Sequence, residues 1–257
     1  MAQWTPFPHP GAYRFDSATL KQQWPQLHCG DAEPLPDDAA VLQAWVLFHN
    51  GDFQEAAQAG LSAGGAGLTV ANRATALYAN YLEKREKARL DLFLQVAERA
   101  QAQAVAAPGN ANAWYLQAYA LGRYSQGISV AKALAQGLGS KVKGALEKTI
   151  ALAPGHADAR IALGAFHAEV IDKVGALIGG MTYGAKKEKG LQLFAEALKL
   201  NPGSAIARIE YANALVMLEG DKRMDEATAL YEQAAAMEPR DAAEHLDVDL
   251  ARAELQD

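Results

Sequence analysis

The sequence predicts an all-α fold, a right-handed α-solenoid of stacked helical hairpins. Alanine, which has the highest helix propensity, accounts for 55 of the 257 residues. Similar helical segments also recur along the chain, each running from a large apolar residue to a proline eight positions later. A unit that returns in this way is typical of a repeat array, whose units stack because none buries its apolar face alone. The three clearest segments are 146–154, 194–202 and 231–239.

The first predicted element is an arm at residues 1–36, which holds six of the ten prolines. Its aromatic residues are Trp4, Phe7, Tyr13, Phe15 and Trp24. Because five aromatic side chains carry much apolar surface, we expect the arm to pack on the helical body; docking on a partner is the alternative. A short helix is expected at 17–24, with Ser17 as its N-cap.

Residues 37–240 are predicted to form the repeat array. An early hairpin is indicated by Ala44, Leu47 and the turn segment 51–56. Later units close with a proline, at Pro108, Pro154, Pro202 and Pro239, and these prolines lie 46, 48 and 37 residues apart. The middle repeats are therefore lengthened, within 122–148 and 174–187, where we expect long helices and a special concave surface.

The last predicted element, residues 241–257, is a helix that caps the array. Leu246, Leu250 and Ala253 fall on one helix face and acidic residues on the other. A solenoid requires such a terminal helix, because its last hairpin otherwise leaves an apolar face in water.

The repeated segments resemble the tetratricopeptide repeat (TPR), a helix pair with small residues where the helices cross and a proline at its end. Small residues allow the helices to approach, and proline ends the second helix because it lacks an N–H and clashes with the preceding turn. The matching residues are Trp114, Ala118, Leu163, Gly164, Phe194, Ala197, Pro202, Tyr211, Ala212, Ala227, Tyr231, Ala234 and Pro239.

The spacing exceeds the TPR period of about 34 residues. In this it is similar to the divergent TPR domains of the regulator-of-microtubule-dynamics proteins and of the periplasmic T-component of TRAP transporters. The likeness covers residues 105–240 and rests on segments 114–115, 122–127, 146–148 and 163–164. It implies a concave face that docks a protein or binds an apolar, lipid-like ligand.

Charge and composition argue against several other classes. The net charge of −6 argues against a nucleic-acid partner, and the single cysteine, Cys29, excludes an intrachain disulfide. No apolar run approaches the ~18 residues of a membrane span. Residues 1–10 contain three prolines and no Lys or Arg, unlike a secretory signal. We therefore expect a cytoplasmic protein without a membrane span.

No group of residues predicts catalysis. The glycines at 175–180 are not followed by the Gly-Lys-Ser/Thr of a phosphate-binding loop. The six histidines include no pair at the i, i+4 spacing of a helical zinc site. We predict that the protein is not an enzyme and that it holds no metal or cofactor.

Two groups of residues are predicted to contact a partner or ligand in the concave groove. Tyr115, Tyr119 and Arg123 are spaced by four, so they share one helix face, in the groove or in the core. A polar group from the later repeats joins them if the repeats stack; the alternative is ordinary capping and surface charge. Its members are His167, Tyr183, Lys187, Glu210 and Asn213.

The predicted function is a non-catalytic scaffold or adaptor whose groove binds a protein or peptide partner. The alternative is a carrier or sensor of a small apolar or lipid-like ligand between the lengthened middle repeats. An open groove with a polar rim favours the first, and a closed, mostly apolar pocket favours the second. The residues expected to hold such a ligand are Tyr115, Tyr119, Ile161, Met181 and Ile209.

Overall fold

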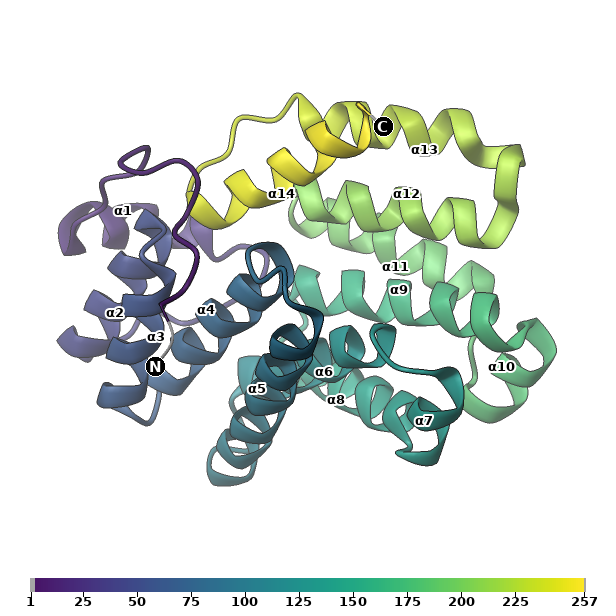
Figure 1. The fold of residues 1–257 in the computed structure, drawn as a ribbon, viewed down its shortest axis with the longest axis horizontal. Helices are drawn as coiled ribbons and strands as arrows, with labels where there is room; N and C mark the ends of the chain where they lie inside the picture. The colour runs from purple at the N-terminus through teal and green to yellow at the C-terminus, as the bar shows by residue number, and fades with distance from the viewer. Residues whose placement is uncertain (1–2, 257) are drawn as a thin grey trace. The chain divides into compact units, whose positions relative to one another are not determined.

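The structure, a computed structural model, describes residues 3–256, and Figure 1 shows that it is built from helices. Residues 1, 2 and 257, at the ends of the predicted arm and capping helix, lie outside the described part. Residues 3–256 contain no strand, so the all-α prediction is confirmed. The chain divides into two compact units. The N-terminal unit holds the described residues up to 28, 33–152 and 241–243; the C-terminal unit holds 29–32, 153–240 and those from 244 on.

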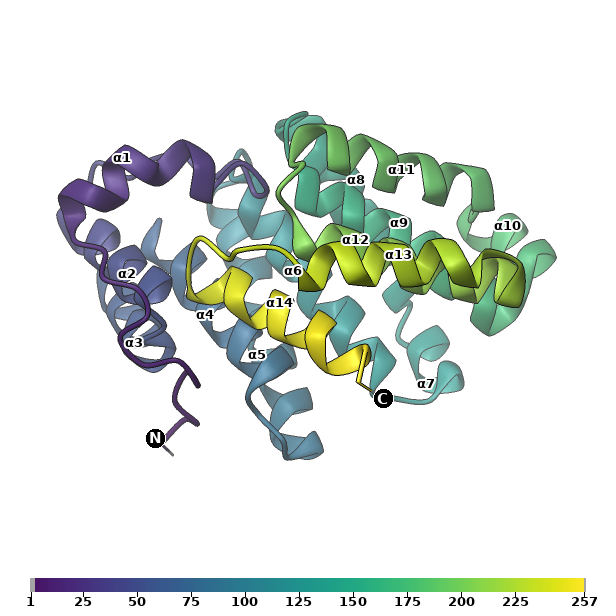
Figure 2. The ribbon, with the colours of Figure 1, turned by 90° about the horizontal axis from the view of Figure 1, so that it is seen from above.

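The body of the N-terminal unit is a stack of three helical hairpins, followed in order of colour in Figures 1 and 2: α2 with α3, α4 with α5, and α6 with α8. Each hairpin packs on the next, through α3 on α4 and α5 on α6. The helices are α1 (Ser17–Leu27), α2 (Ala39–Asn50), α3 (Phe53–Ala63), α4 (Gly67–Tyr81), α5 (Glu86–Ala106), α6 (Ala111–Gln126), α7 (Val130–Ala135) and α8 (Leu138–Leu152).

The C-terminal unit contains two further hairpins, α9 with α11 and α12 with α13, and α12 packs on both α9 and α11. Stacked helical hairpins are thus found in both units, as predicted. The elements are α9 (Ala157–Val174), α10 (Ala176–Tyr183), α11 (Lys187–Leu200), α12 (Ala205–Glu219), a 3₁₀ turn (Gly220–Arg223), α13 (Met224–Ala235) and α14 (Ala242–Glu254).

The same turn, a Pro-Gly pair followed by a capping residue, precedes α6, α9 and α12. The side chains of Asn110, His156 and Ser204 each accept a hydrogen bond from the backbone N–H three residues on, at 3.1, 3.0 and 3.1 Å. Each bond satisfies an N–H that the first helical turn leaves without a partner. This recurring turn sets where each new hairpin begins.

Glycines allow neighbouring helices to cross in close contact. Gly60 of α3 and Gly67 of α4 face each other, and a Cβ atom added to either would lie 2.5 Å from the carbonyl oxygen of the other. At the α9–α11 crossing, a Cβ added to Gly164 would lie 2.8 Å from the ring of Phe194. No side chain fits at these points, so glycine sets the distance between the helix axes.

The extra residues of the middle repeats form short separate helices, α7 and α10, and not the long helices that we expected. α7 is capped by Ser129, whose hydroxyl accepts a hydrogen bond from the backbone N–H of Lys132 at 3.3 Å. α10 lies between Gly175 and Gly184, whose φ angles of +83° and +64° are rarely adopted by other residues. These turns end α6 and α9, so the inserted residues cannot extend those helices.

The N-terminal arm contacts the first two hairpins of its own unit. Trp4 stacks on Tyr78 of α4, with ring centroids 4.1 Å apart. Phe7 is buried against Phe53 of α3 and lies over Gly51, where a Cβ atom would come within 2.6 Å of the Phe7 ring. The aromatic residues that mark this segment in the sequence therefore supply apolar contacts with α3 and α4.

Helix α1 is capped differently from our expectation. The cap is Asp16, not Ser17, and the helix runs three residues beyond the predicted end at 24. The Asp16 carboxylate accepts hydrogen bonds from the backbone N–H groups of Ala18 and Thr19 at 2.9 and 2.8 Å. These two charge-assisted bonds stabilise the turn that starts at Asp16, which places Ser17 inside the helix.

A buried chain of polar side chains joins α1, α2 and the start of α14 within the N-terminal unit. His49 Nδ1 lies 2.5 Å from an Asp241 carboxylate oxygen, and His49 Nε2 lies 3.1 Å from Nε2 of His28. All three residues are at most 4 % exposed, and the rings of Trp24 and Trp45 pack on His28. Both ring nitrogens of His49 have partners, as a buried imidazole requires.

The apolar face of α14 differs in part from the predicted one. Leu246 is buried as expected, but Ala253 is exposed. Val248 and Ala251 are buried instead, in a cluster with Ile209 of α12, and Leu250 packs at the edge of this cluster. The helical period allows either Ala253 or the pair Val248 and Ala251 to face inward with Leu246. Contact with α12 and α13 buries Val248 and Ala251.

Replacing Gly60 by Ala is expected to lower the free energy of unfolding by about 2 kcal/mol, because the methyl group overlaps the backbone of α4. Gly144 is the control: it is an exposed glycine within α8, and an added Cβ meets nothing within 4 Å. Gly144→Ala is expected to raise the free energy of unfolding by about 0.5–1 kcal/mol. Chemical denaturation followed by circular dichroism measures both. Equal effects would contradict a close α3–α4 crossing.

Asp241→Ala is expected to lower the free energy of unfolding by about 3 kcal/mol, because it leaves the buried His49 imidazole without its acidic partner. Asp221→Ala, at an exposed position in the 3₁₀ turn, is the control and is expected to change stability by less than about 0.5 kcal/mol. Urea denaturation at neutral pH compares the two variants. A loss at Asp241 no larger than at Asp221 would mean that the carboxylate does not support His49.

Candidate partner-binding site

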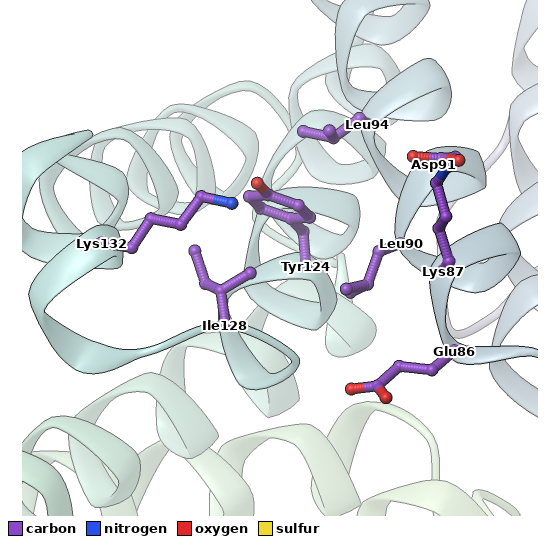
Figure 3. Close-up of a pocket in the computed structure, with 8 residues that line it drawn as sticks. All are labelled: Glu86, Lys87, Leu90, Asp91, Leu94, Tyr124, Ile128 and Lys132. Atoms are coloured by element: carbon purple, nitrogen blue, oxygen red, sulfur yellow. The ribbon is translucent and has the colours of Figure 1, made fainter.

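An open cleft of about 360 Å³ lies in the N-terminal unit, between the first half of α5 and the end of α6 with α7 (Figure 3). We call it the α5–α7 cleft. Four apolar and four charged side chains line it. The apolar residues are Leu90, Leu94, Tyr124 and Ile128, and the charged residues are Glu86, Lys87, Asp91 and Lys132.

Helical spacing and one glycine place the apolar residues. Leu90 and Leu94 are four residues apart on α5, so they point from the same face. On the other wall, Tyr124 lies near the end of α6 and Ile128 follows in the turn to α7. A Cβ atom at Gly127 would lie 2.5 Å from Cδ2 of Leu90. A glycine at 127 therefore lets Leu90 approach this turn.

Charges of both signs surround the apolar residues. Glu86, Lys87 and Asp91 come from α5, while Lys132 comes from α7. Figure 3 shows the Lys132 side chain extending toward Tyr124, and its ammonium nitrogen lies 5.8 Å from the Tyr124 ring centroid. A cation over a tyrosine face is attracted by the ring quadrupole, which holds Lys132 at the edge of the cleft.

The start of α5 is held by a buried carboxylate, Glu83, in the turn after α4. Glu83 accepts hydrogen bonds from the Arg85 backbone N–H at 2.9 Å and guanidinium at 2.7 and 2.9 Å, and from the Tyr78 hydroxyl at 3.2 Å. The hydrogen bond from the Arg85 side chain is the main reason why the pKa of Glu83 falls to about 2. This network positions the first turn of α5, which supplies Glu86 and Lys87 to the cleft.

The structure brings together the first predicted group, Tyr115, Tyr119 and Arg123, along one face of α6. The two tyrosine rings are tilted with centroids 6.1 Å apart, and the Arg123 guanidinium carbon lies 5.4 Å from the Tyr119 ring centroid. Tyr115 is buried, whereas Tyr119 and Arg123 are half-buried. Tyr115 therefore belongs mainly to the core, and the role of Tyr119 and Arg123 in a groove stays a prediction.

The second predicted group lies in the C-terminal unit, where its members have different environments. His167 is buried, and its Nδ1 accepts a hydrogen bond from the Lys186 backbone N–H at 3.2 Å. Tyr183 meets Phe166 edge to face, with centroids 6.3 Å apart. Lys187 forms an ion pair with Glu219. These contacts join α9, α10, α11 and α12.

Glu210 and Asn213, the remaining members, lie on α12 next to Tyr231 of α13. The Tyr231 hydroxyl donates a hydrogen bond of 2.6 Å to the Asn213 side-chain oxygen. Burial is the main cause that raises the pKa of Tyr231 to about 12, and the negative charge of Glu210 adds to it. Asn213 thus supports the α12–α13 hairpin. Whether any of the second group contacts a partner stays a prediction.

The residues proposed for an apolar ligand do not share one environment in the C-terminal unit. Ile161 is buried in a core cluster with Phe194, and Ile209 is buried in another cluster with Val248. Met181, in contrast, is 82 % exposed on α10. The two isoleucines fill the interior of the hairpins and are not placed to line a pocket with Met181.

Sequence reasoning did not select the residues of the α5–α7 cleft. The available signal was the i, i+4 spacing of Leu90 with Leu94 and of Tyr124 with Ile128. Apolar pairs at this spacing also mark the buried face of any amphipathic helix. The bend at Gly127 separates the end of α6 from the start of α7. This bend leaves the side chains around an open cleft and not in the core.

Comparison with solved structures indicates a TPR-like helical repeat. One similar structure is that of TTC0263, a thermophilic TPR protein in Thermus thermophilus. The TM-score is 0.57 with 16 % sequence identity, over 83 % of this chain and 97 % of that one. No family model and no curated protein matches the sequence. The likeness establishes the TPR-like fold, while the subtype suggested by the wide repeats stays a prediction.

Glu83→Gln is expected to lower stability most at neutral pH, and the difference from the wild type is expected to shrink as the pH falls from about 4.5 toward 2. The ordinary pKa of this carboxyl is 4.5 and its folded value is about 2, so the stabilisation is present above 4.5 and is lost on protonation. Urea denaturation at several pH values measures the difference. A difference that does not depend on pH would mean that the charge of Glu83 is not what stabilises the turn.

Proposed function

We propose that the protein is a non-catalytic scaffold that binds a short helical or extended segment of a partner protein in the α5–α7 cleft. Helical repeat folds of this kind generally serve as interaction scaffolds, because stacked hairpins present long surfaces on a rigid frame. A fold alone does not define a partner, so the proposal rests on the cleft.

The observation that carries the proposal is the combination of an open cleft, apolar side chains inside it and charges of both signs around it. Protein interfaces have this arrangement, an apolar centre that excludes water within a charged rim. Pockets for small apolar ligands are mostly enclosed and have few charged groups. Four of the eight lining residues are charged, which supports a peptide over a lipid-like ligand.

The chemistry of the lining residues suggests the kind of segment. Leu90 and Leu94 present one turn of apolar surface on α5, and Tyr124 and Ile128 oppose them. A partner helix with apolar residues at i and i+4 matches this length. Its flanking residues would carry both signs of charge, to pair with Lys132 on one wall and with Glu86 and Asp91 on the other.

The predicted strip of Tyr119 and Arg123 is proposed as a second contact on α6. An arginine over a half-buried tyrosine forms a flat platform with a polar edge, and both residue types are enriched where proteins bind one another. The carrier alternative has less support, because Ile161 and Ile209 lie within core clusters.

Leu94→Glu is expected to weaken binding of a selected peptide at least about 10-fold, because it places a carboxylate among the apolar residues of the cleft. Peptides are first selected from a random library on the wild-type protein, and their affinities are then measured by fluorescence anisotropy. Leu61→Glu, at an exposed leucine of α3 outside the cleft, is the control and should bind normally. Equal affinities for both variants would place the binding surface elsewhere.

Tyr119→Asp is expected to reduce capture of the same peptides, while Tyr119→Phe retains it, because the ring and not the hydroxyl carries the contact with Arg123. The affinities are again measured by anisotropy, with circular dichroism to verify folding. If Tyr119→Asp binds as well as the wild type, the α6 strip is not part of the docking surface.

A further inference from the structure

The short helix α10 presents an apolar patch to solvent. Leu177, Ile178 and Met181 are 76 %, 58 % and 82 % exposed. They belong to twelve consecutive residues, 174–185, without any charge. We call these three side chains the α10 patch.

The other side of α10 is held by the protein. A Cβ atom on Gly179 would lie 2.9 Å from the Val170 side chain of α9, so the two helices are in close contact there. Tyr183 packs edge to face on Phe166, also of α9. α10 is therefore positioned by α9 through Gly179 and Tyr183, while its large apolar side chains point away from that contact.

The size of the α10 patch argues against a stable dimer as its occupant. Three side chains supply at most a few hundred Å² of apolar surface, whereas a standard interface buries about 800 Å² on each partner. Such a small patch, clear of charges, is suited to insertion into a medium that is itself apolar, where shape complementarity is not required.

The charges next to the α10 patch favour an anionic surface. Residues 172–189 contain four lysines and two acidic residues, a net charge of +2 within a chain of −6. Lys173 pairs with Asp172 and Lys187 pairs with Glu219. Lys186 and Lys189, at the start of α11, are exposed. With Glu219, the partner of Lys187, included, the net charge of this group is +1, and the lysines that contribute it, Lys186 and Lys189, lie directly beside the uncharged segment.

We propose that α10 docks the protein on an anionic lipid bilayer. Leu177, Ile178 and Met181 enter the boundary between headgroups and acyl chains, and Lys186 and Lys189 contact the lipid phosphates. This is peripheral binding: none of the helices within residues 3–256 is both long and apolar enough to span a membrane. The proposal goes beyond the scaffold function, since the α10 patch belongs to the C-terminal unit and the α5–α7 cleft to the N-terminal one.

The expected affinity is modest. A single myristoyl chain binds bilayers with an association constant of about 10⁴ M⁻¹, and three side chains with adjacent lysines are comparable. Half of the protein is therefore expected to bind at about 0.1 mM accessible lipid. Each lysine near the membrane surface is expected to change the binding constant about fivefold, and added salt weakens this effect by screening.

The test is co-sedimentation of the full chain with phosphatidylcholine vesicles that contain about 30 % phosphatidylglycerol. The triple variant Leu177→Ser, Ile178→Ser, Met181→Ser is expected to lose at least about 10-fold in binding. The double variant Lys186→Gln, Lys189→Gln is expected to lose a similar factor, and the wild type is expected to bind pure phosphatidylcholine less well. Val105→Ser, which removes a 71 % exposed valine from α5, is the matched control and should bind normally.

Three results would overturn the proposal: no binding by the wild type, full binding by the triple variant, or dimers in light scattering that the triple variant abolishes. The last would assign the α10 patch to a second copy of the chain. All substituted side chains are exposed, so thermal denaturation should be unchanged. The peptide affinity of the triple variant separates the two proposals. Loss of vesicle binding with normal peptide binding would mean that the α10 patch is needed for lipid and not for the peptide.

Discussion

The close approach of helix backbones determines how the hairpins of this protein pack. Where Gly60 meets Gly67, and where Gly164 meets Phe194, an added methyl group would overlap a neighbour. The abundant alanine has the same consequence over the wider interfaces, because small side chains let helix axes come near while still covering apolar surface. The positions of the hairpins, and of every surface they present, follow from these contacts.

The two inserted helices, α7 and α10, distinguish this array from a regular repeat. A regular repeat has the same surface at each hairpin, whereas α7 and α10 add short elements between the helices of two hairpins. α7 contributes Lys132 to the edge of the α5–α7 cleft, and α10 carries an apolar patch on a helix free of charge. Both helices begin at turns that stop the preceding helix. Each insertion therefore adds a short helix without lengthening α6 or α9.

Much of the fold could be predicted from the sequence, because its causes are local. The prolines that close each unit and the alanine-rich helices between them are visible at fixed spacing, and the Pro-Gly turns recur before Asn110, His156 and Ser204. The form of the insertions was predicted wrongly, since the positive φ angles at Gly175 and Gly184 are not visible in a glycine-rich apolar stretch.

The candidate site was harder to predict, because its causes are not local. The i, i+4 spacing did place Tyr115, Tyr119 and Arg123 on one face, but it could not distinguish a groove from the core. The α5–α7 cleft exists because a helix ends at Gly127 opposite Leu90, and the contact between His49 and Asp241 joins residues 192 positions apart. Periodicity carries no information about either.

The position of Asp241 in the chain has a consequence for synthesis. The N-terminal unit includes His49 from its first hairpin and Asp241 from near the end of the sequence. During translation the helices of this unit leave the ribosome long before Asp241 is made, so His49 is without its acidic partner in that interval. The hairpins can form and stack in that interval, but the packing around His49 cannot be completed until Asp241 has been made and has left the ribosome.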